Sequence, residues 1–223
     1  ARLIMILKIF SVDELDISRG YKNGLKKIQS SSNFEKCMLI IWLLGPLIYL
    51  IERSPADAWL SALAIIFLIR SYINKEWRWL KQNWFKFSIA LWLTGLISAV
   101  LSPDPLFTFS QGFVWIRFPL YAVAVQTWLA RDRDIRILML LSMGLGMIIM
   151  CLILTAELIF SPLDPSGVVK TRLTWPYGDL VPGGYLAKVS LPLFCVLIAI
   201  AVNKASKLSG YLGLIALIPL GYL

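Results

Sequence analysis

The sequence predicts an all-α protein, a polytopic bundle of transmembrane helices. Hydrophobic residues make up 58% of its 223 residues and charged residues only 16%, whereas a soluble domain has about 25% charged residues. The mean hydropathy is +0.74. The apolar residues also gather in successive long runs, and a helix that crosses a membrane needs about 20 such residues.

The runs predict six complete spans and the start of a seventh. The complete spans are 37–51, 58–73, 87–101, 107–129, 137–160 and 184–202, and the seventh begins near 210. Pro46 predicts a kink in the first span, and residues 52–55 read as a tight turn after it. Gly144 and Gly146 allow another helix to approach the fifth span closely. Because the seventh run is too short to span, we expect a longer parent protein.

Basic residues predict the sidedness of the bundle. Lys and Arg are frequent in 1–36, 70–86 and 131–136 and scarce in 52–57 and 102–110. Since cytoplasmic loops carry the excess of Lys and Arg, the N-terminus is predicted to be cytoplasmic. Residues 1–36 then read as a basic cytoplasmic arm, able to lie on anionic headgroups, and 37–223 as the transmembrane domain. Strict alternation places loop 161–183 on the extracytoplasmic side.

The net charge of +9 raises the question of nucleic acid as a partner. Residues 74–86 interleave basic residues with tryptophans, a pattern that can bind single strands. Between two spans the same pattern predicts an interfacial aromatic belt, so we expect membrane lipids and no nucleic acid as partners. The chain has no histidine, and its three cysteines lack metal-ligand spacing. No metal or cofactor is therefore expected.

Arg117 lies near the middle of the fourth run. A midplane arginine costs roughly 2.5–3.5 kcal/mol on insertion scales, and such arginines are functional candidates. Residues 118–129 are too short to span without it. Arg117 therefore lies either in a helix that lines a polar cavity or at a break assisted by Pro119. An ion pair with Glu157 is the structural alternative.

A polar segment, 170–188, interrupts the apolar runs. It carries Lys170, Arg172 and Asp179 among aromatic and turn residues, which predicts an ordered loop. The planar fork of an arginine suits a pyrophosphate, although Arg172 could equally meet lipid headgroups or Asp179. Lys188, one turn into the sixth span, either snorkels to the surface or adds positive charge to the same vestibule.

Three segments together resemble the O-antigen ligase family and the related O-antigen polymerases. They are Trp115-Ile-Arg-Phe-Pro-Leu-Tyr121 with the Arg/Asp-rich turn that follows, the long fifth span, and Arg172-Leu-Thr-Trp-Pro-Tyr-Gly178, which leads through Gly-Gly-Tyr-Leu into a helix. Many relatives have Phe and Pro-Asn where this loop reads Trp-Pro-Tyr-Gly-Asp, which leaves ligase or polymerase open.

The resemblance implies a multi-pass, metal-independent glycosyltransferase of the bacterial inner membrane, active in lipopolysaccharide biosynthesis. Such enzymes move a glycan from undecaprenyl pyrophosphate to a lipid A-core or another glycan. Arg172 matches the family's arginine before the loop, and membrane physics adds Arg117 and Lys188 as substrate-binding candidates. The family's base is a histidine in a large later loop, so the catalytic residue is expected outside this chain, which alone should be inactive. The alternatives are a transporter or flippase for a lipid-linked or anionic substrate, and a scaffold.

Overall fold

A computed structural model describes residues 17–51, 53–161, 173–176 and 183–202, and within these ranges the chain is helical and has no strand. The predicted all-α class is confirmed. The elements, in chain order, are α2 (Ile17–Ser30), α3 (Asn33–Leu43), α4 (Gly45–Ile51), α5 (Arg53–Ile73), the 3₁₀ turn η2 (Arg78–Lys81), α6 (Asn83–Val100), α7 (Pro105–Val114), α8 (Arg117–Ala124), the π-helical turn η3 (Val125–Leu129), α9 (Arg133–Phe160) and α10 (Gly183–Val202).

Four helical stretches are long and apolar enough to cross a membrane, which indicates a membrane protein. They are Asn33–Leu50, Ser54–Ile73, Asn83–Val100 and Arg133–Phe160. The first begins before the predicted residue 37, because the Ser32 side chain accepts a hydrogen bond from the Glu35 amide at 3.3 Å and caps the helix. It divides at Leu44, beside the predicted kink at Pro46.

The predicted turn at 52–55 is wrong for Arg53–Pro55, which form the first turn of α5. Proline is tolerated there because the first N–H groups of a helix have no intrahelical acceptor. Glu52 and the predicted seventh span lie outside the described residues.

The fourth apolar run is not one helix. α7 ends at Val114 and α8 begins at Arg117, so the break is realised and a continuous span over 107–129 is wrong. Pro119 has no N–H to donate to the Trp115 carbonyl four residues before it. The Phe118 amide donates a hydrogen bond to that carbonyl instead, at 3.1 Å. The run ends in η3, where the Ala130 amide reaches back to the Val125 carbonyl at 2.8 Å.

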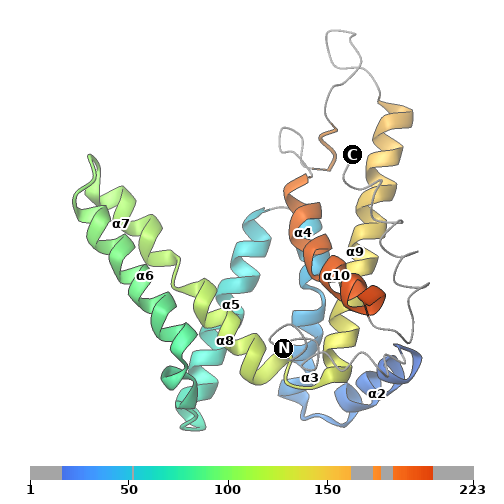
Figure 1. The fold of residues 1–223 in the computed structure, drawn as a ribbon, viewed down its shortest axis with the longest axis horizontal. Coiled ribbons are helices and arrows are strands. Elements are labelled where there is room, and N and C mark those ends of the chain that lie inside the picture. Colours follow the sequence, from blue (N-terminus) through green and yellow to red (C-terminus); the bar gives the residue numbers. More distant parts are fainter. Residues whose placement is uncertain (1–16, 52, 162–172, 177–182, 203–223) are drawn as a thin grey trace.

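Residues 17–30 form an amphipathic helix that packs on the start of α9 (Figure 1). Its buried face carries Gly20 and Gly24, against which the side chains of Ile137 and Leu138 lie so closely that a Cβ would collide. Lys27 adds an ion pair with Asp134 at 2.9 Å. Part of the predicted basic arm is thus attached to the bundle.

Figure 1 shows how the helices pack. α4, α9 and α10 pack together, α5 pairs with α8, and α6 and α7 form a hairpin that projects from α5 and α8. Gly146 is the close contact between α9 and α10, because a Cβ there would collide with the Tyr185 hydroxyl, which donates to the Pro46 carbonyl at 2.8 Å. The expectation for Gly144 is wrong, since a Cβ there meets nothing within 4 Å.

Candidate functional site

Arg117 makes an ion pair with a neighbouring helix. Its Nη2 lies 3.0 Å from Oδ1 of Asp57 on α5, and its Nη1 donates a long hydrogen bond of 3.4 Å to the Ser61 hydroxyl. The guanidinium also lies 5.2 Å from the centre of the Phe118 ring. The pair is partly buried, with side-chain exposures of 19% for Arg117 and 33% for Asp57. The break between α7 and α8 thus positions a charge that α5 stabilises.

This contact fixes the depth of Arg117 along α5. Asp57 and Ser61 stand four and eight positions after the start of α5, which corresponds to about 6 and 12 Å of helix rise. The alternative of an ion pair between Arg117 and Glu157 is wrong, because Arg117 pairs with the carboxylate of Asp57. Arg117 therefore lies in the half of the bundle where α5 begins and not at its centre.

Tyr49 lies close to both Lys188 and the Asp57–Arg117 pair. The Lys188 Nζ stands 5.7 Å from the centre of the Tyr49 ring. The Tyr49 ring also packs edge-on against Trp59, with 6.0 Å between ring centres. We call Tyr49, Asp57, Ser61, Arg117 and Lys188 the Arg117 cluster. It joins α4, α5, α8 and α10.

Glu157 has a different role from the predicted one. Its carboxylate is fully buried and accepts hydrogen bonds from the Thr174 amide, the Thr174 hydroxyl and the Trp175 amide at 2.8 to 3.1 Å. It therefore fastens residues 173–176, where the Trp175–Pro176 peptide is cis, to the end of α9. Three other predicted site residues lie outside the described residues: Lys170, Arg172 and Asp179.

The Nε–H of Arg117 is a buried donor without a hydrogen-bond partner among the described residues. A guanidinium has five N–H groups, and the Nε–H of Arg117 is shielded from solvent without a hydrogen-bond acceptor among the described residues. A buried donor without a partner costs about 1–3 kcal/mol. The cluster thus combines a buried guanidinium N–H that has no acceptor among the described residues with an exposed ammonium, that of Lys188, on the Tyr49 ring.

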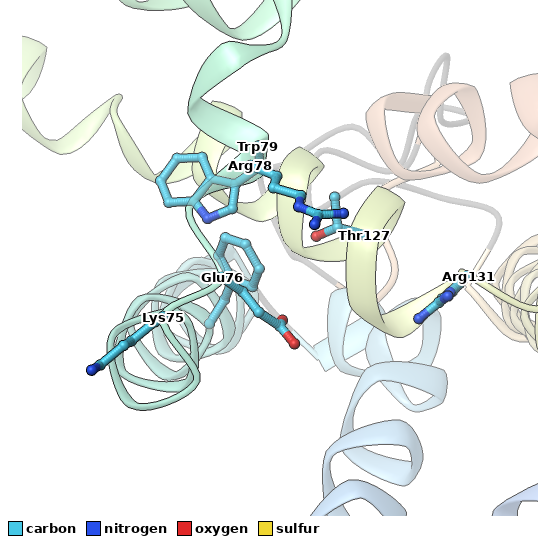
Figure 2. A pocket seen from close by; sticks show the side chains of 7 residues that line it. Lys75, Glu76, Arg78, Trp79, Thr127 and Arg131 are labelled. Carbon is cyan, nitrogen blue, oxygen red and sulfur yellow. The ribbon is translucent and has the colours of Figure 1, made fainter.

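Two hollows in the described part of the chain lie at the other end of the bundle, where α5 ends. One has a volume of about 430 Å³ and is lined by Phe67, Lys75, Glu76, Arg78, Trp79, Thr127 and Arg131; Figure 2 shows its side chains. The other, of about 460 Å³, lies between Phe34 on α3 and Ile69 and Ile73 on α5. No residue of the Arg117 cluster lines either hollow, so the predicted site and the cavities do not coincide.

Three members of the cluster, Tyr49, Asp57 and Ser61, were not predicted from the sequence. Asp57 carried a usable signal, since it is the one acidic residue within the 54–73 span and intramembrane carboxylates are functional candidates by default. Tyr49 carried none, because its role depends on how α4, α5 and α10 meet. The chain matches no protein-family model, no curated protein and no solved structure.

Proposed function

We propose that the chain belongs to a membrane transferase that moves a glycan from undecaprenyl pyrophosphate to a lipid A-core or another glycan. In this proposal it has six complete spans and part of a seventh, with a cytoplasmic N-terminus in the bacterial inner membrane. The Arg117 cluster then faces the extracytoplasmic side. The resemblance of the Trp115–Tyr121 and Arg172–Gly178 segments supports the chemistry, and the cluster supports the location.

The observation that carries the proposal is the unpaired Nε–H of Arg117. Asp57 balances the charge of Arg117 at Nη2, and the Nε–H on the same edge of the guanidinium is left without an acceptor among the described residues. A phosphate oxygen that replaced or joined Asp57 there would receive the directional, charge-assisted bonds that guanidinium groups make to phosphates. Lys188 supplies a second positive charge from α10, and Arg172 is assigned to the same pyrophosphate by the resemblance.

The chemistry asked of these residues is stabilisation of the leaving group. When the glycan leaves the lipid carrier, negative charge grows on the pyrophosphate, and fixed donors aimed at that charge lower the barrier. This role needs no metal. The acceptor hydroxyl must also lose a proton, and the resemblance assigns that step to a histidine, a residue this chain does not contain.

The test uses the full-length protein in cells that make a lipid-linked glycan. We expect Lys188→Gln and Arg172→Gln each to reduce glycan attachment at the surface, with the lipid-linked donor accumulating and the protein level unchanged. Lys86→Gln, which removes an exposed cation from α6, is the matched control. Normal attachment in both the Lys188→Gln and the Arg172→Gln variants would refute the site.

A transporter or flippase is the second candidate, and one observation favours it. The α7–α8 break places an arginine and its aspartate partner at a discontinuous helix, and substrate sites of transporters are typically formed by such helices. The two functions predict different locations of the accumulated donor in a Lys188→Gln strain. A transferase defect leaves the donor on the extracytoplasmic leaflet, and a flippase defect leaves it on the cytoplasmic leaflet.

A further inference from the structure

The 430 Å³ hollow at the end of α5 is built from two segments about 50 residues apart. Arg78 and Trp79 come from η2, and Thr127 and Arg131 come from η3 and the residues after it. In Figure 2 the guanidinium groups of Arg78 and Arg131 extend toward the hollow from opposite sides, whereas the Lys75 amine points away. The guanidinium groups of two arginines therefore lie at the same hollow.

The positive charge of this hollow is not neutralised by the protein. Within the described residues, Lys75, Arg78 and Arg131 make no ion pair. The one carboxylate in the lining, Glu76, pairs with Arg70 at 2.6 Å. An anion in the hollow would therefore meet two uncompensated guanidinium groups and a carboxylate whose charge is already balanced.

Trp79 gives the hollow an aromatic wall. Its side chain is 5% exposed and packs against Phe67 and Phe85, with ring centres 5.4 and 5.0 Å away. Its indole N–H is buried and has no acceptor among the described residues, whereas buried indole N–H groups usually have a hydrogen-bond partner.

Two backbone irregularities lie beside the same hollow. Lys75 has a φ of 55° and ends α5 in the position that glycine usually takes, with the Glu76 amide bonded to the Ser71 carbonyl at 3.0 Å. Across the hollow, the π turn η3 precedes Arg131, and such turns are frequent at functional sites. Both irregularities redirect the chain just before the lining arginines.

We propose that this hollow binds a phosphate group. The guanidinium forks of Arg78 and Arg131 provide the directional donors that phosphate oxygens accept, and about 430 Å³ is within the usual size of a small-molecule site. The phosphate belongs to an anionic lipid headgroup or to a free phosphate ion. The site is separate from the Arg117 cluster and does not depend on the function proposed for that cluster.

The test measures binding to the full chain in neutral detergent micelles by isothermal titration calorimetry. The probes are dioctanoyl phosphatidylglycerol, dioctanoyl phosphatidylcholine and inorganic phosphate. We expect Arg78→Gln with Arg131→Gln to weaken binding of the phosphatidylglycerol or the phosphate by about tenfold or more. Preference for phosphatidylglycerol identifies a headgroup site, and equal binding of inorganic phosphate identifies a free-ion site.

The matched control is Lys81→Gln with Lys86→Gln, which removes two exposed cations of the same segment that do not line the hollow. We expect it to weaken binding by no more than about threefold, since neither lysine lines the hollow and charges at a distance are screened by salt. Arg78→Lys with Arg131→Lys keeps the charge and guards against misfolding; its expected affinity is intermediate. The proposal is overturned if the control pair weakens binding as much as the arginine pair, or if neither phosphate probe binds. An oligonucleotide that binds where the phosphate probes do not would overturn it as well.

Discussion

Replacing Arg117 by Gln removes the ion pair between α8 and α5. Because Arg117 and Asp57 are 19% and 33% exposed in their side chains, the cost lies between that of an exposed pair, about 0–1 kcal/mol, and that of a broken buried pair, about 3–5 kcal/mol. We expect about 2 kcal/mol of lost stability. Most of it reflects the lost attraction between Arg117 and the partly buried Asp57 carboxylate.

A double-mutant cycle with Asp57→Asn isolates the pair. Unfolding of the purified chain in mixed micelles, followed by circular dichroism, gives the free energy of each variant. We expect a coupling energy of about 1–2 kcal/mol, within the usual range for residues in contact. A coupling within about 0.5 kcal/mol of zero would refute the ion pair as a stabilising contact. Lys86→Gln again serves as the control.

The same pair separates structure from function. Replacing both residues by Leu removes the charges together, and such replacements of buried pairs are often neutral or stabilising. If Arg117 binds the pyrophosphate, the double Leu variant folds as well as the wild type and fails in glycan attachment. Restored attachment in that variant would show that Arg117 serves only to hold α8 on α5.

Three further predictions concern contacts elsewhere in the fold. Glu157→Gln places the NH₂ group of the new side chain against the Thr174 or Trp175 amide, which are both donors. We expect the free energy of unfolding to fall by about 2–3 kcal/mol in the same assay, and unchanged stability would contradict the anchoring role. Gly146→Ala should lower the melting temperature through its collision with α10, whereas Gly144→Ala should be neutral or stabilising by up to about 1 kcal/mol; equal effects would contradict the packing. The pKa of Lys27 is raised above its ordinary 10.5 by the hydrogen bond to the Asp134 carboxylate on α9. The contribution of Lys27 to stability is therefore complete below pH 10.5 and is lost as pH rises through the raised pKa. Lys27→Met should remove this alkaline loss of stability from a series of melting curves, and an unchanged loss would contradict the ion pair.

Patterns along the chain predicted the helices better than the contacts between them. Hydropathy located α5, α6 and α9, and a length argument gave the break at Arg117 as one of two alternatives, because both are properties of a single segment. The one partner considered for Arg117, Glu157, is not the residue that pairs with it. The pairing with Asp57 requires α8 to cross the beginning of α5, and no local pattern encodes that crossing.

Glu157 shows a second reason why contacts are hard to predict from the sequence. Its possible ion pair with Arg117 could be considered because charges are visible in a sequence, whereas backbone amides are the same everywhere. In the fold its carboxylate accepts hydrogen bonds from the amides of residues 174 and 175. The hollow at the end of α5 illustrates the same limit, because residues 74–86 were recognised as basic and aromatic, while Arg131 follows only after α6, α7, α8 and η3.

The broken fourth run has a consequence for how the protein enters the membrane. α7 and α8 have ten and eight residues, so each rises only about 15 Å or less. Arg117 at the start of α8 further opposes insertion of this segment into the membrane by itself. Asp57 belongs to α5, which is synthesised earlier and is apolar enough to insert unaided. Insertion of the segment should therefore follow that of α5 and depend on it, and losing the charge at Asp57 should appear first as misassembly during biogenesis.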